Sequence, residues 1–170
     1  ELCKIYSGVS WQHNILVIDN RFISERVNQI RNWNMDFVHG DILDKDLVKK
    51  YFSDADIVHH LAGITDVPRT KNDSTKEKDE RIKLVGEEGT QNILDAISNK
   101  CKIIFPSTHV IYEGMGKVKN DIKENEESQP VLSYSLSKAI NEKQLKDSGK
   151  NYVILRLGSV YGYSTDTTRI

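Results

Sequence analysis

Tyr134 and Lys138 are the residues of this chain whose types and spacing most directly allow chemistry. They stand four residues apart in LSYSLSKAI, a stretch with the composition of a helix, so both side chains lie on one helical face. An ammonium group held close to a phenol favours its ionised form, and a phenolate can act as a base. The alternative is a surface tyrosine beside a surface lysine, since a chain with seven tyrosines is expected to contain about one such pair by chance.

Thr108 is a second candidate, because it ends the apolar stretch KIIFPST. A hydroxyl group at the end of a strand can hydrogen-bond a reacting oxygen atom. Taken alone, a β-branched threonine at this position is more often structural.

Asp19 follows the apolar stretch NILVI and is a candidate ligand for a ribose. In dinucleotide-binding folds, a carboxylate at the end of the second strand binds the adenosine ribose about 20 residues after a glycine-rich turn. That turn would fall at or before Glu1, so we expect the natural protein to begin further upstream. A loop-capping aspartate is the alternative. The carboxylate would repel a 2′-phosphate, so NAD is favoured over NADP, although Arg21 weakens this preference.

Five short apolar runs set the architecture that must position these residues. They predict buried strands at 14–19, 35–40, 56–63, 102–108 and 152–158. Helical patterns begin at Ser24, at Lys45 after a capping Asp44, at about Arg81 and at Ser133. The alternation predicts an α/β fold with a doubly wound parallel sheet and a ligand crevice at the carboxyl ends of the strands. The polar segments 68–80 and 113–130 are expected to be loops, either solvated or covering a substrate.

The composition excludes several classes of protein. The chain has 170 residues, 38% hydrophobic and 29% charged, which is typical of one globular domain, and its net charge of −1 gives no footprint for nucleic acid. No apolar run approaches the length of about 18 residues that a membrane span needs, so we expect a cytoplasmic protein without a membrane partner. Cys3 and Cys101 lack the spacing of metal ligands and are expected to be reduced thiols.

His59 and His60 invite a metal interpretation. Neighbouring residues of a strand point to opposite faces, so the two side chains cannot easily share one ion. The sequence offers no further cluster of ligands near them. We therefore expect no metal site. His109 is expected to pack or to face solvent.

Seven strings occur in order along the chain: VIDN, GDILD, HHLAG, GTQNILDA, FPSTHVIYEG, YSLSK and LRLGSVYG. In this order, from about residue 14 to 163, the chain resembles the extended short-chain dehydrogenase/reductase family, specifically its NAD-dependent nucleotide-sugar epimerases and dehydratases. The resemblance implies that residues 1–170 are a partial NAD-binding Rossmann domain. Its first strand and glycine loop would precede the chain, and a C-terminal substrate domain would follow it. We expect this stretch alone to be neither autonomous nor active.

The resemblance also implies the role of each site residue. The NAD-binding residues would be Asp19, Asn20, Asp41, Ile42, Leu61, Ala62, Gly63, Tyr134 and Lys138. Thr108, Tyr134 and Lys138 would be catalytic, with Tyr134 as the base, and Thr108 and Ser159 would contact the substrate. Three positions depart from the family: Gly86 replaces an Asn that bridges elements near the cofactor, Ser159 replaces an Asn, and Tyr163 replaces a Pro.

The expected activity is epimerisation or dehydration of a nucleotide-sugar with NAD regenerated in each cycle. Epimerisation is slightly favoured, since His109 and Val110 stand where an acidic pair is common in dehydratases. A reductase or dehydrogenase with exchangeable cofactor is an alternative, and a non-catalytic dinucleotide-binding scaffold is another. The family resemblance also implies a homodimer formed through the helix from Ser133.

Overall fold

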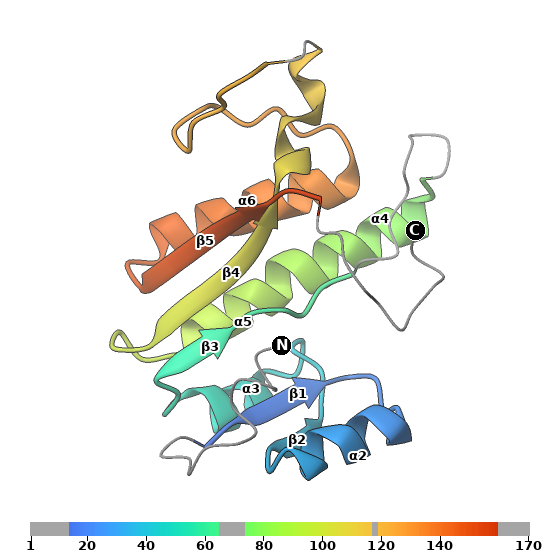
Figure 1. Cartoon of the computed structure of the whole chain (residues 1–170), viewed down its shortest axis with the longest axis vertical. Helices are drawn as coiled ribbons and strands as arrows, with labels where there is room; N and C mark the ends of the chain where they lie inside the picture. Colours follow the sequence, from blue (N-terminus) through green and yellow to red (C-terminus); the bar gives the residue numbers. More distant parts are fainter. Residues whose placement is uncertain (1–13, 65–73, 117–118, 160–170) are drawn as a thin grey trace.

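Parallel strands alternate with helices along the part of the chain that the computed structural model describes, residues 14–64, 74–116 and 119–159 (Figure 1). The strands are β1 (Leu16–Asp19), β2 (Asp36–His39), β3 (Ile57–His59), β4 (Lys102–Thr108) and β5 (Asn151–Leu157). All five predicted strands are confirmed. Only β3 is much shorter than its predicted range of 56–63. It ends early because the chain leaves the sheet after the backbone N–H of His60 donates to the carbonyl of Ile104.

The predicted helices connect these strands, with two corrections. One concerns residues 76–80, and the other is an unpredicted helical turn at residues 109–115, which overlaps the loop expected over 113–130. They are α2 (Ser24–Asn32), α3 (Lys45–Phe52), α4 (Lys76–Lys83), η2 (Leu84–Glu88), α5 (Gly89–Ala96), η3 (His109–Met115) and α6 (Ser133–Asp147). The prediction of a loop over 68–80 and a helix from about Arg81 is wrong at its boundary, because α4 begins at Lys76 and is capped by the hydroxyl of Thr75. The stretch KEKDE favours helix by propensity but carries no apolar periodicity that would reveal it.

The strands form two parallel ladders, β1-β2 and β3-β4-β5. Within the described residues, β1 pairs only with β2, and β3 pairs only with β4. Leu16 and Ile57 lie on the two edges that face away from these partners and are 37% and 56% exposed.

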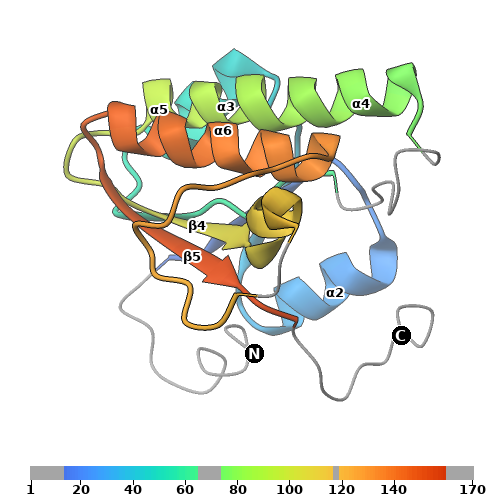
Figure 2. The ribbon, with the colours of Figure 1, turned by 90° about the horizontal axis from the view of Figure 1, so that it is seen from above.

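Helices cover both faces of the strands (Figure 2). The α3, α4, α5 and α6 helices lie on one face, and α2 lies on the other. The main core fills the space between the first group and the sheet, and it consists of Ile42, Val48, Val58, Ile93, Leu94, Ile97, Cys101, Ile103, Phe105 and Leu145. The core therefore fixes α6, with Tyr134 and Lys138, against the strand that ends in Thr108.

Candidate functional site

The three predicted catalytic residues come from β4 and the first turns of α6. Thr108 is buried at the end of β4, and its Oγ1 accepts a hydrogen bond of 3.2 Å from the backbone N–H of Val110, which caps η3. Lys138 extends from α6 to the same strand, where its Nζ donates to the carbonyl of Pro106 at 2.8 Å. That Nζ lies 5.9 Å from the centroid of the Tyr134 ring. Because α6 packs on β4, residues far apart in the sequence meet at one end of the sheet.

The electrostatics of Tyr134 and Lys138 differ from the expectation. Burial lowers the pKa of Lys138 to about 8. Burial also raises the pKa of Tyr134 above its ordinary value. In this chain by itself, loss of solvent dominates at the phenol, so the lowering of the Tyr134 pKa expected from Lys138 is not seen. The ammonium group of Lys138 donates to the Pro106 carbonyl.

The predicted ribose ligands also meet, at the carboxyl ends of β1 and β2. The parallel register places Asp19 beside His39, and the Asn20 side chain donates to Asp41 at 3.0 Å. The Asp19 carboxylate is exposed and accepts only one described hydrogen bond, from the backbone N–H of Arg21 at 2.8 Å. Within the described ranges, the other carboxylate oxygen of Asp19 accepts no hydrogen bond.

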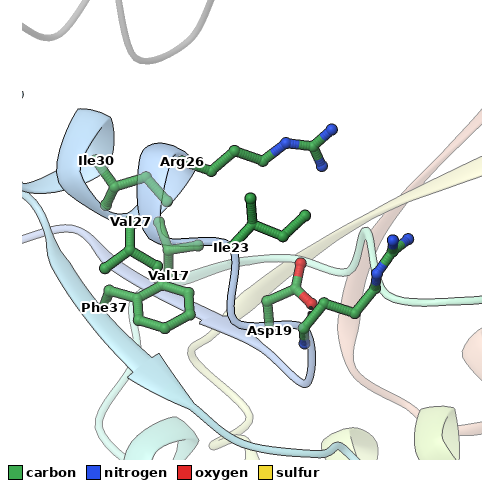
Figure 3. A pocket seen from close by; sticks show the side chains of 8 residues that line it. Val17, Asp19, Ile23, Arg26, Val27, Ile30 and Phe37 are labelled. Carbon is green, nitrogen blue, oxygen red and sulfur yellow. Dashed lines mark hydrogen bonds between the residues drawn. The ribbon is translucent and has the colours of Figure 1, made fainter.

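A pocket lies next to Asp19, between β1, β2 and α2 (Figure 3). Its wall is apolar, with Val17, Val27 and Phe37 side by side, whereas Asp19 and Arg26 bring opposite charges to it. The pocket therefore joins an apolar surface to the carboxylate that the sequence assigns to the ribose.

Ile42 is placed differently from its neighbour Asp41. Its side chain is buried in the core, where a Cβ added to Gly89 would come within 2.3 Å of it. Its carbonyl accepts a hydrogen bond of 3.0 Å from Asn92. These contacts hold the loop after β2 against α5, so of the two residues only Asp41 presents a side chain near Asn20.

The segment from Leu61 to Gly63 follows β3 and is exposed, with Leu61 at 67%. A Cβ added to Gly63 would meet no atom within 4 Å, so the backbone there is open to a ligand. The buried side chain of His60 holds the start of this segment against α5, because its Nε2 forms a hydrogen bond of 2.9 Å with the Thr90 hydroxyl.

The two histidines behave as the strand alternation predicts, with His59 exposed and His60 buried. Burial, followed by the charge of Lys138, lowers the pKa of His60 to about 3, so its ring is neutral at physiological pH. Among the described residues, no group of three or more His, Cys, Asp or Glu side chains could hold a metal ion. His109 is exposed, and its Nδ1 lies 3.1 Å from the carbonyl of Leu157.

Of the three positions that depart from the family pattern, the structure explains the glycine at position 86. A Cβ on Gly86 would lie 2.1 Å from the Ser137 hydroxyl, so glycine allows η2 to approach α6 closely, and Asn141 of α6 donates to the Gly86 carbonyl at 2.9 Å. Ser159 is exposed just beyond β5, two residues after Leu157, which is the partner of Thr108 in the sheet. Tyr163 lies outside the described residues.

A buried ion pair next to Thr108 was not predicted from the sequence. Glu142 is 3% exposed and accepts hydrogen bonds from Ser107 at 2.7 Å and from Arg156 at 2.9 and 2.7 Å. Burial raises the pKa of Glu142, but the hydrogen bonds from Arg156 and Ser107 outweigh it and hold the pKa below its ordinary value. The only available signal was that Glu142 follows Lys138 by four residues and so shares its helical face.

Glu113 was also missed. This residue of η3 accepts hydrogen bonds from the backbone N–H groups of Val131 and Leu132 at 2.8 and 2.7 Å, and from the hydroxyl of Ser135. It therefore contacts the start of the helix that carries Tyr134. Glu113 and Leu132 are 19 residues apart in the sequence, so a local sequence pattern does not predict their contact.

Known proteins share both the sequence and the fold. Residues 7–170 match the family described as the NAD dependent epimerase/dehydratase family. The chain is 30% identical over 154 residues to the CDP-paratose 2-epimerase of Salmonella typhi, covering 76% of this chain and 44% of the relative. It is 27% identical over 161 residues to the UDP-N-acetyl-alpha-D-glucosaminuronate decarboxylase of Bacillus cytotoxicus, covering 88% and 48%.

Among solved structures, the UDP-glucuronic acid 4-epimerase of Bacillus cereus, crystallised with NAD, superposes with a TM-score of 0.74 at 26% identity, covering 95% of this chain and 53% of that one. The predicted Rossmann-type sheet is thereby confirmed. The chain spans about half the length of these relatives. The match over nearly all of its residues shows that the chain belongs to the NAD-dependent epimerase/dehydratase family.

Proposed function

We propose that the protein containing this chain is an NAD-dependent enzyme that epimerises or dehydrates a nucleotide-sugar, with epimerisation favoured. The observation that carries this proposal is the position of Lys138, whose Nζ donates to the carbonyl of Pro106, two residues before Thr108 on β4, and lies 5.9 Å from the centroid of the Tyr134 ring. The family relationship and the nucleotide-sugar names of several relatives support the substrate class.

The described residues fit NAD. Asp19 is exposed beside a pocket, and its carboxylate suits a ribose hydroxyl and disfavours a 2′-phosphate. Arg21 and Arg26 line the same pocket and reduce this preference, so the choice of NAD over NADP is supported by the family relationship. The open backbone at Gly63 permits close approach of a cofactor. When bound, NAD would accept a hydride from a carbon of the sugar and return it later in the cycle.

Thr108 and Tyr134 would hydrogen-bond the sugar hydroxyl and accept its proton. The Oγ1 of Thr108 accepts from Val110, so its own proton remains free to donate to the reacting oxygen. Tyr134 would take the proton of the sugar hydroxyl as the general base. Burial raises the pKa of this phenol in the chain alone, so its ionisation needs a positive charge, which Lys138 can supply from the same helical face.

The first experiment is to purify the full-length protein with its natural flanking sequence, denature it, and assay the released cofactor. We expect bound NAD, and we expect interconversion of a UDP-, GDP- or dTDP-sugar without net production of NADH. A protein that retains no NAD and converts none of these sugars would contradict the proposal.

Tyr134→Phe tests the assigned base in the same protein. We expect turnover to fall by about 100-fold or more, while NAD retention stays at the wild-type level because the ring is preserved. The measurements are a steady-state assay and cofactor quantification. Tyr152→Phe, on β5, is the matched control and should keep full turnover. Near-complete activity of Tyr134→Phe would show that another group is the base.

A dehydrogenase is the second candidate. The chain is 26% identical over 147 residues to the 3beta-hydroxysteroid-dehydrogenase/decarboxylase isoform 2 of Arabidopsis thaliana, covering 78% of this chain and 24% of that protein. Such an activity would release NADH in amounts equal to the substrate oxidised. The cofactor assay therefore separates the two candidates.

A further inference from the structure

Glu113 joins the two elements that carry the proposed acid–base residues. The η3 turn begins where the Thr108 hydroxyl caps it and contains Glu113 near its other end. The α6 helix begins one residue before Tyr134. Figure 2 shows the η3 turn beside the start of α6. A rigid link between these elements therefore sets how Thr108 and Tyr134 lie relative to each other.

The link consists of several hydrogen bonds that converge on the first turn of α6. Leu132 stands at the N-cap position and has no side chain that could cap the helix. The carboxylate of Glu113 instead accepts from the backbone N–H groups of Val131 and Leu132, which precede the first helical residue, and from the hydroxyl of Ser135, which is fully buried. Two backbone hydrogen bonds of 2.8 Å, from Gly114 to Gln129 and from Gln129 to Ile111, hold the same two segments together.

The charge of Glu113 suits this position. Burial raises its pKa, but hydrogen bonds from Ser135, Leu132 and Val131 outweigh burial and hold the pKa below its ordinary value. A carboxylate is also favoured by the positive end of the helix dipole. At neutral pH the residue is therefore a charged acceptor for two backbone donors just before α6 and for one hydroxyl in its first turn.

We propose that Glu113 is a positioning residue that fixes Tyr134 relative to Thr108 for proton transfer. The proposal rests on the proposed function. Misplacing a reacting group by about 1 Å can reduce a rate by about 100-fold without weakening substrate binding. Glu113 would thus affect turnover through geometry, by way of its contacts with Val131, Leu132 and Ser135.

The test uses the full-length protein with UDP-glucose, or with whichever UDP-, GDP- or dTDP-sugar the wild type converts. We expect Glu113→Ala to lower kcat by about 10- to 100-fold, while KM and the amount of retained NAD change by less than about twofold. Glu113→Gln keeps an oxygen acceptor at the same place and should recover most of kcat. A general loss of stability would not lower kcat while leaving KM and the NAD content nearly unchanged.

Ser148→Ala is the matched control, because Ser148 caps the other end of α6 by donating to the Leu145 carbonyl at 2.7 Å. It should lower the melting temperature but leave kcat unchanged. The inference is overturned if Glu113→Ala keeps the kcat of Ser148→Ala, or if its kcat, KM and NAD content all deteriorate together. An inactive wild type would instead overturn the proposed function and this inference with it, so the two failures are distinguishable.

Discussion

At the scale of single residues, burial changes the pKa of Lys138. Its ammonium group donates to the Pro106 carbonyl and lies 4.4 Å from the centroid of the Phe105 ring, which partly compensates for lost water. Burial still lowers its pKa to about 8. The residue is therefore cationic at neutral pH and loses its charge in mildly alkaline solution.

This pKa leads to a prediction for the full-length enzyme. A group of lowered pKa is charged below that value and neutral above it, so kcat should fall as the pH rises through about 8. Lys138→Arg keeps the charge across this range and should remove that fall, even if its rate is lower. Lys138→Ala should reduce both turnover and NAD retention, measured by pH-rate profiles and cofactor assay.

Lys143→Ala is the control for these variants, since Lys143 is exposed on the same helix. It should leave the profile unchanged. A Lys138→Ala variant with normal turnover and normal NAD content would exclude the role assigned to this lysine.

At the scale of elements, the Glu142 and Arg156 pair ties β4, β5 and α6 together. Ser107 of β4 and Arg156 of β5 both donate to Glu142 of α6, and Arg156 also donates to the Tyr112 hydroxyl of η3. The strand that ends in Thr108 is thus held to the helix of Lys138 by a charge network as well as by the core.

Glu142→Leu should destabilise the protein by about 3 kcal/mol, because it leaves a largely buried guanidinium without its partner. The measurement is urea unfolding. The pKa of Glu142 is depressed below its ordinary value of 4.5, so its stabilising effect exists above that value and disappears as the pH falls. The difference from wild type should therefore shrink in acid.

Lys146→Met provides the comparison on the same carboxylate, since Lys146 is 48% exposed and pairs with Glu142 at 3.3 Å. Its loss should cost less than about 1 kcal/mol. Equal effects of the two variants would mean that the buried pair contributes no more than a surface pair.

Most elements were predictable because their signals are local. Runs of Val, Ile and Phe marked the strands, and Asp44 marked the start of α3 by accepting from Asp46 and Leu47 as expected. The start of α4 was missed, since its charged residues carry no periodicity. Glu113 and Glu142 were missed for another reason: they act through partners 14 to 35 residues away, which only the folded chain brings near.

At the scale of the whole molecule, the described part contains no helix long and apolar enough to cross a membrane.

Two apolar side chains on α6, Leu136 and Ile140, are 42% and 39% exposed and stand four residues apart on one face. Leu84 on the neighbouring η2 is also 42% exposed. We propose that this apolar face pairs with a second copy of the protein.

Ile140→Glu should therefore shift the full-length protein from dimer to monomer, because it places a charge in an apolar contact. Light scattering coupled to size exclusion measures the change. Lys143→Glu, which is exposed on the same helix, is the control and should not alter the mass. A wild type that is monomeric at all concentrations tested would contradict the proposed pairing.

The separation of the two ladders has a consequence for how the molecule loses its structure. The main core cluster packs on β3 and β4, and β1 and β2 contribute none of its residues. Contiguous parts with few buried contacts open at lower free energy than the rest of a fold. Among the described residues, the half that holds Asp19 thus shares fewer buried contacts with the main core than the half that holds Tyr134, and we expect it to be the weaker cooperative unit. A bound dinucleotide that touched both halves would stabilise the weaker one, so cofactor occupancy would govern resistance to proteolysis near Asp19 more than near the proposed base.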